Sequence, residues 1–94
     1  MSELPKHPTA ELEGLRWEDH SEPGFAYWHL RDAEGDLIAE AYQRGDGIRW
    51  HCKTSDWREM VDDMETAKLR AVVSHVRHLY VAWADASVKA RTSP

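Results

Sequence analysis

Residues 37–53 read Leu37-Ile-Ala-Glu-Ala-Tyr-Gln43, then Arg44-Gly45-Asp46-Gly47, then Ile48-Arg-Trp-His-Cys-Lys53. In the last run Ile48, Trp50 and Cys52 alternate with polar residues, which indicates a β-strand with one buried face. The first run is also interpreted as a strand, and the glycine-rich segment between the two is typical of a tight turn. Because a short turn joins antiparallel neighbours, this stretch predicts a β-hairpin.

The residues before this hairpin extend the pattern. Leu15, Trp17 and Asp19 alternate with polar residues and predict another half-buried strand. Residues 25–31 are aromatic and prone to form a strand. A turn signal containing glycine follows each of these two runs. We therefore expect an antiparallel meander of three to four strands over about residues 15–53.

A long helix is expected after the meander. Asp62 with Glu65 three residues later has the spacing of a capping box, so the helix should begin near residue 63 and run to about residue 86. Residues 54–62 fit either a fifth short strand or an early helical turn. Apolar residues recur at helical spacing along the expected helix: Leu69, Val72, Val73, Val76, Leu79, Tyr80 and Trp83. The expected fold class is α+β, with the meander packed on this helix.

The chain of 94 residues is long enough for one domain. We expect a flexible N-terminal arm over residues 1–13, a single domain over residues 14–86, and a frayed polar tail over residues 87–94. No apolar run approaches the ~20 residues that a membrane span needs. The lone Cys52 and the absence of a basic-then-apolar leader indicate a reducing, cytoplasmic location.

The expected helix is longer than the sheet is wide. A helix of about 24 residues spans ~36 Å, whereas four strands span only ~19 Å. The overhanging end needs cover from the N-terminal arm, a second copy of the chain or a partner. We expect a homodimer to form through this end, at Val76, Tyr80 and Trp83.

The sheet is expected to have one covered face and one open face. The small residues of 37–41 and the alternating Trp17, Ile48 and Trp50 are assigned to the helix side. The other face should then carry some of the remaining apolar residues beside two polar ones: Trp28, Leu30, Ile38 and Tyr42, with Arg49 and His51. Aromatic residues and arginines dominate binding hot spots, so this face is a possible docking surface. The alternative is that the arm or residues 54–62 fold over it.

No catalytic or metal-binding pattern stands out in the sequence. His75 and His78 share one side of the expected helix, but no Cys-x-x-Cys or His-Glu-x-x-His spacing is present. Cys52 lies on the expected buried face, where a thiol acts as a small apolar side chain. Paired carboxylates lie in strands, in turns or at the helix start, with no cleft for them to share. We therefore expect no enzyme activity, no cofactor and no metal.

Charge favours a protein partner over a nucleic acid. The formal net charge is −5 and the basic residues never form a run, whereas phosphate binding needs clustered cations. A blocker of a nucleic-acid-binding protein would instead use carboxylates as phosphate mimics. The residues assigned to these roles are the anchors Trp28, Tyr42, Arg49 and His51, and the carboxylates Glu18, Asp19, Glu34, Asp36 and Glu40.

The run over residues 27–40, followed by Gly47-Ile-Arg-Trp50 and an acidic-started helix, resembles small meander-plus-helix proteins of bacteriophages and other mobile elements. Some proteins of that kind are anti-CRISPR or host-takeover factors, which act by plugging a site on a host protein. The resemblance covers roughly residues 15–85. The chain is also similar to the three-strand-plus-helix arm-site DNA-binding domains of phage integrases, but its strands carry Glu18, Asp19 and Glu40 instead of basic residues.

These observations together predict a small, acidic, non-enzymatic protein-binding module. The specific candidate is a phage-type inhibitor of a host or defence complex that acts by protein contact or by nucleic-acid mimicry. The alternative is a regulator that binds DNA or RNA with its sheet.

Overall fold

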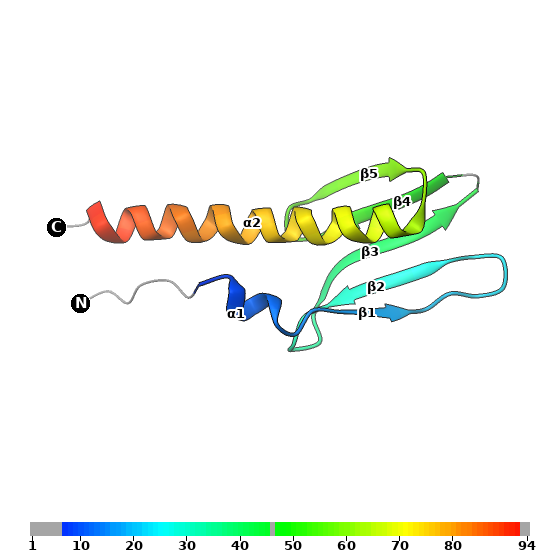
Figure 1. Ribbon diagram of the computed structural model, residues 1–94, viewed down its shortest axis with the longest axis horizontal. Helices are drawn as coiled ribbons and strands as arrows, with labels where there is room; N and C mark the ends of the chain where they lie inside the picture. Colours follow the sequence, from blue (N-terminus) through cyan, green and yellow to red (C-terminus); the bar gives the residue numbers. More distant parts are fainter. Residues whose placement is uncertain (1–6, 46, 93–94) are drawn as a thin grey trace.

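The computed structural model describes residues 7–45 and 47–92 and shows an α+β fold. Five antiparallel strands form one sheet in the order β1-β2-β3-β4-β5, and one long helix packs on it (Figure 1). In chain order the elements are α1 (Thr9–Leu12), β1 (Arg16–Asp19), β2 (Tyr27–Arg31), β3 (Leu37–Arg44), β4 (Gly47–Cys52), β5 (Trp57–Val61) and α2 (Met64–Thr92). The predicted meander and its packing on the C-terminal helix are confirmed, but the sheet has five strands instead of three to four.

The additional strand comes from the segment that the sequence left open. β5 pairs with β4 so that Trp57 lies opposite Cys52 and Val61 opposite Ile48. The turn before β5 places Asp56 at a positive φ of 52°, a conformation that aspartate tolerates better than most residues. This turn contains no glycine, which is why the sequence did not separate a strand from a helical turn here.

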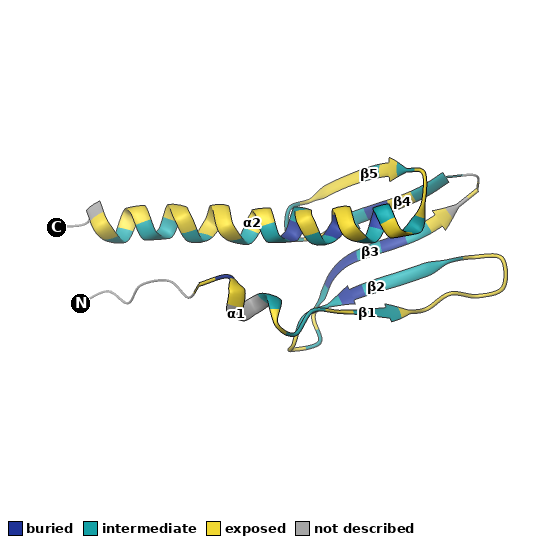
Figure 2. Cartoon of the chain, viewed as in Figure 1, coloured by how far each residue is buried: buried dark blue, intermediate teal, exposed yellow. Residues whose placement is uncertain are grey.

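Small side chains bring α2 and the sheet together. Ala39 and Ala41 on β3 and Ala67 and Ala71 on α2 are all fully buried. Alanine leaves little between the two backbones, so the helix lies close against the sheet. Five other buried side chains belong to this core or lie against it: Leu30, Ile38, Trp50, Cys52 and His75 (Figure 2).

Three residues expected on the open face lie in or beside this core. Trp28 pairs with Ala41 and Leu30 pairs with Ala39, which places both on the face that α2 covers. The pairing then shifts at the end of β2, so that Ile38 is an extra, bulged residue and joins the core. The sequence therefore assigned Trp28, Leu30 and Ile38 to the wrong side, because alternation within one strand does not tell which of its faces the helix covers.

The helix begins at Met64, close to the expected start, and ends later than expected. Its cap is Asp63 and not Asp62 of the expected capping box. The carboxylate of Asp63 accepts hydrogen bonds from the backbone N–H of Thr66, at 2.7 Å, and from its hydroxyl, at 2.9 Å. The expected frayed tail is wrong for residues 87–92, which continue α2 to Thr92. Ala84, Ala86 and Ala90 favour helix at this end, and Lys89 and Arg91 stabilise the negative end of the helix dipole. Residues 93–94 lie outside the described part.

The predicted overhang of the helix is present. α2 packs on β3, β4 and β5, and its C-terminal half runs beyond the sheet beside α1 (Figure 1). The 29 residues of α2 span ~43 Å, in a molecule that measures 57 × 23 × 15 Å. The His7 ring lies 5.6 Å from Tyr80 and 4.9 Å from Trp83. The N-terminal segment from His7 onward thus covers part of the overhang, while residues 1–6 of the expected arm lie outside the described residues. Among the described helices, none has the length and apolar character to cross a membrane.

Replacing Ala71 by Leu is expected to destabilise the fold by about 1–3 kcal/mol, because a larger side chain must separate α2 from β3 and β4. The control Val81→Leu changes a residue that is 56% exposed and should stay within about 0.5 kcal/mol of wild type. Urea unfolding followed by tryptophan fluorescence measures both. Equal stabilities for Ala71→Leu and wild type would contradict the close helix–sheet packing.

Candidate functional site

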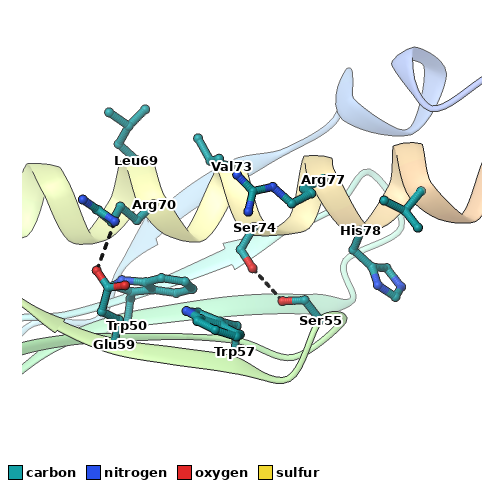
Figure 3. Close-up of a pocket in the computed structure, with 11 residues that line it drawn as sticks. Trp50, Ser55, Trp57, Glu59, Leu69, Arg70, Val73, Ser74, Arg77 and His78 are labelled. Carbon is teal, nitrogen blue, oxygen red and sulfur yellow. Dashed lines mark hydrogen bonds and ion pairs between the residues drawn. The ribbon is translucent and has the colours of Figure 1, made fainter.

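A groove of about 700 Å³ lies between α2 and the β4–β5 hairpin. Its apolar lining consists of Leu69, Val73 and Val81 on α2, Trp57 on β5 and the buried Trp50. Figure 3 shows Trp57 on the sheet side of the helix, whereas Leu69 and Val73 point from the helix away from the sheet. The helix is centred over β3 and β4, so the side chains along this edge have no further element above them. The groove is therefore a consequence of where the alanine contact holds the helix.

The apolar residues of the groove are unusually exposed for their size. The exposed fractions are 59% for Trp57, 65% for Leu69, 47% for Val73 and 56% for Val81. The sequence placed Leu69 and Val73 in the apolar stripe of the helix and left the segment of Trp57 unassigned. A clustered set of exposed apolar side chains, with an aromatic residue among them, is typical of a protein-binding surface.

The polar lining of the groove includes two arginines and one glutamate. Arg70 pairs with Glu59 at 3.3 Å, and the hydroxyls of Ser55 and Ser74 are 2.7 Å apart. Arg77 also lines the groove and makes no ion pair with any described residue. An acidic chain of net charge −5 thus presents excess positive charge here.

Next to the groove, a buried polar chain links the sheet to the helix. The thiol of Cys52 lies 3.3 Å from the hydroxyl of Thr54, which is 2.8 Å from Nδ1 of His75. Burial by itself raises the pKa of Cys52, but hydrogen bonds from His75, Ser55 and Thr54 outweigh it and lower the pKa to about 6. Cys52 has no exposed surface, so reagents and substrates do not reach its sulfur in the folded state.

The opposite face of the sheet carries two rows of polar and aromatic residues. The first row crosses all five strands in register and consists of Glu18, His29, Glu40, His51 and Arg58. The second row crosses β2 to β5 and consists of Tyr27, Tyr42, Arg49 and Met60. Five of the residues expected to bind a partner lie together on this open face: Tyr42, Arg49, His51, Glu18 and Glu40. The predicted open face is thus more polar than the sequence suggested.

Of the four remaining residues, Glu34 and Asp36 lie in the connection between β2 and β3, and the other two lie on the other side of the sheet. Trp28 is opposite Asp19 in the β1–β2 register, on the helix-covered face. The ammonium group of Lys68 lies 3.7 Å from the centre of the Trp28 ring and 5.6 Å from that of Trp17. Asp19 accepts a hydrogen bond from the backbone of Ser21 at 2.8 Å, and hydrogen bonding by Ser21 lowers the pKa of Asp19. Trp28 and Asp19 therefore do not join the open-face residues.

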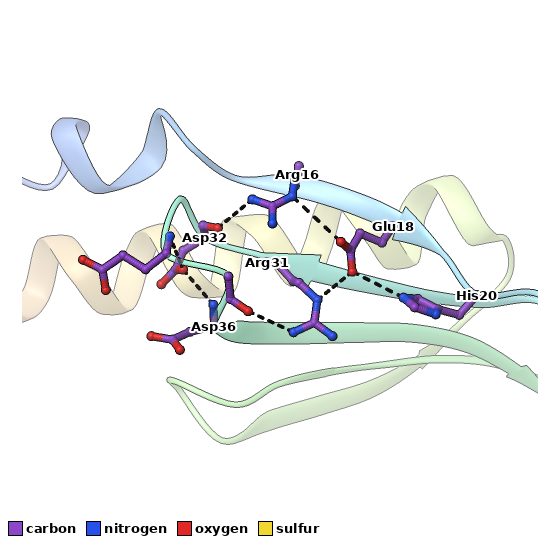
Figure 4. A network of polar contacts seen from close by, with 8 residues as sticks. Arg16, Glu18, His20, Arg31, Asp32 and Asp36 are labelled. Carbon is purple, nitrogen blue, oxygen red and sulfur yellow. Dashed lines mark hydrogen bonds and ion pairs between the residues drawn. The ribbon is translucent and has the colours of Figure 1, made fainter.

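Glu18 is engaged within the chain (Figure 4). Its carboxylate lies 2.6 Å from Nε of Arg31, 3.3 Å from Nε2 of His20 and 3.9 Å from Nε of Arg16. The hydrogen bond from Arg31, followed by that from His20, lowers the pKa of Glu18. A carboxylate with these partners is a weak phosphate mimic, because its charge is already balanced.

The predicted dimer contact lies on the overhang of α2. Tyr80 and Trp83 pack against the ring of His7, and Val76 is half-buried. The chain's own N-terminal segment therefore occupies part of the surface that was assigned to a second copy.

Comparison of this chain with protein-family models, with curated proteins and with solved structures found no significant match.

The thiol of Cys52 is expected to titrate near pH 6 instead of near 9. The lowered folded-state pKa also means that the thiolate stabilises the fold above its ordinary pKa of about 9, and that this contribution is lost as the pH falls through 6. Thiolate absorbance, with Cys52→Ala as the blank, measures the midpoint. Thr54→Val removes one hydrogen bond to the thiol and should raise the midpoint. A wild-type midpoint in the ordinary thiol range would refute the lowered pKa of Cys52.

Proposed function

We propose that this protein is a protein-binding module and that the groove between α2 and the β4–β5 hairpin is its docking site. One observation supports this most directly: Trp57, Leu69 and Val73 are all exposed, and all three line a groove next to the core. Each Trp side chain can bury on the order of 200 Å². Covering these residues with a partner recovers hydrophobic free energy that the isolated chain leaves unused.

The chemistry of the groove indicates the kind of segment that fits it. Apolar side chains line it, and Arg70 and Arg77 flank them. A partner segment with apolar residues on one side and carboxylates at its margin would match both features. Because Arg70 already pairs with Glu59, Arg77 is the cation that gains most from an acidic partner.

In this proposal the protein acts by occupying a surface of its partner and performs no chemistry on it. An inhibitor of a host or defence complex in the cytoplasm would act in this way. This is also the function that the sequence resemblance implies. The groove takes over the role that the sequence assigned to Trp28 and the open sheet face.

The double variant Leu69→Asp/Val73→Asp is expected to bind the partner at least about 30-fold more weakly, because it places charge at the apolar contact. Met60→Asp is the matched control, since Met60 is 63% exposed and lies on the open face. Quantitative affinity capture from cells that encode the protein compares wild type with both variants. Circular dichroism confirms that all three are folded.

The proposal is supported by a near-stoichiometric protein that wild type and Met60→Asp retain and the double variant loses. The same proteins at the same levels in all three samples would contradict it. Analytical ultracentrifugation of the purified proteins tests self-association. If wild type sediments as a dimer and the double variant as a monomer, the groove binds a second copy of the chain.

A second candidate function is nucleic-acid binding by the open face of the sheet. The strand register gathers four arginines there that are scattered in the sequence: Arg16, Arg31, Arg49 and Arg58. The rings of Tyr27 and Tyr42 lie 6.0 Å apart on the same face, and aromatic rings stack on unpaired bases. This arrangement favours single-stranded over double-stranded nucleic acid.

Under this alternative, a labelled single-stranded oligonucleotide should bind at low salt with a micromolar dissociation constant, and Arg49→Glu should weaken binding by about tenfold. Arg77→Glu, on the far side of the molecule in the groove, serves as the control. Fluorescence anisotropy at two salt concentrations gives both values. No change in anisotropy at micromolar protein would remove this alternative.

A further inference from the structure

The open face carries a cluster of metal-ligating side chains at the β1–β2 hairpin. Glu18 on β1 lies directly opposite His29 on β2, and His20 follows two residues after Glu18 on the same face. The backbone N–H of His20 bonds to the carbonyl of Tyr27 at 2.8 Å, which continues the β1–β2 ladder and fixes its position. One ligand atom from each of the three side chains lies within 4.8 Å of the other two.

The state of His29 is what distinguishes this cluster from an ordinary surface group. Both ring nitrogens of His29 are closed off from solvent, and neither has a hydrogen-bond partner among the described residues. An imidazole usually satisfies at least one nitrogen when it loses water. The ring of His20 lies 4.4 Å away at a 40° tilt, so two imidazoles are brought together without a bond between them.

We propose that Glu18, His20 and His29 form a binding site for a Zn²⁺ ion. Zinc bonds to nitrogen and carboxylate oxygen are about 2.0–2.2 Å long, which separates the ligand atoms of a tetrahedron by roughly 3.3–3.6 Å. Nε2 of His20 and Oε1 of Glu18 are already 3.3 Å apart. The side chain of His20 is 46% exposed, so it is free to turn toward the position that the other two ligands define.

A neighbouring arginine supports coordination by the cluster. Arg31 donates to Glu18 at 2.6 Å and also to the carbonyl of Gly35 at 2.9 Å (Figure 4). It is placed to orient the ligating carboxylate from outside, as hydrogen-bonded outer partners do in metal sites.

The same arginine limits the strength of the site. Its charge, with that of Arg16 at 3.9 Å, offsets the single carboxylate, so we expect micromolar instead of nanomolar affinity. Three protein ligands leave a fourth position for water or for a group from a partner. The ion would link the edge strand β1 to β2. These two strands lie next to β3, β4 and β5, the strands on which α2 packs.

Titration calorimetry of the metal-free protein with zinc chloride is expected to give one site per chain. His20→Ala and His29→Gln should each weaken binding by at least about tenfold, since even the loss of an outer partner of a metal ligand costs that much. His78→Ala removes an exposed histidine on α2, in the groove lining, and should bind as wild type does. Cobalt substitution should give the intense visible bands of tetrahedral Co²⁺.

His20 is exposed, so His20→Ala keeps the test valid even if His29→Gln proves unstable. The proposal is overturned by the absence of zinc binding at about 100 μM metal, a hundredfold above the low-micromolar dissociation constant expected. It is equally overturned by wild-type affinity in His20→Ala, which would move the ion elsewhere, for example to Asp32, Glu34 and Asp36 in the β2–β3 turn. None of these outcomes depends on the groove, so this site and the proposed docking function are tested separately.

Discussion

The contact between two alanines of β3 and two alanines of α2 sets the arrangement of the whole molecule. Because Ala39, Ala41, Ala67 and Ala71 are fully buried, the helix lies close over the middle of the sheet and its larger neighbours are displaced to either side. Toward β1 and β2 the indoles of Trp17 and Trp28 receive cover from Lys68. Toward β5 Trp57 remains 59% exposed among the residues that the structure describes, and the groove results.

The sequence predicted those parts of the fold that local signals define. Alternation in residues 48–53 and a glycine-rich turn were sufficient for the β3–β4 hairpin, and an acidic cap marked the start of α2. The failures have equally local causes. The turn at Asp56 carries no glycine, the bulge at Ile38 breaks the alternation, and alanines beyond Trp83 continue a helix after its apolar stripe weakens.

The two proposed sites were harder to predict because each depends on long-range geometry. To predict the groove, one must know how α2 is rotated about its axis. The buried alanines determine this rotation, whereas a list of apolar positions does not. The cluster of Glu18, His20 and His29 requires the β1–β2 register. Sequence reasoning weighed His75 with His78, since that pair is close in the chain. Only strand pairing brings His29 next to the other two ligands.

The two sites lie on opposite faces of one sheet and draw on different parts of it. The groove uses α2 and β5, whereas the histidine cluster uses β1 and the β2 residue across from it. α2 packs on β3, β4 and β5, so the β1–β2 hairpin depends more on its own hydrogen bonds and on the Glu18–Arg31 pair for its order. A ligand that ties β1 to β2 therefore stabilises the part of the fold that the helix holds least. Such an ion would order the hairpin without altering the docking surface, because the alanine contact separates the two.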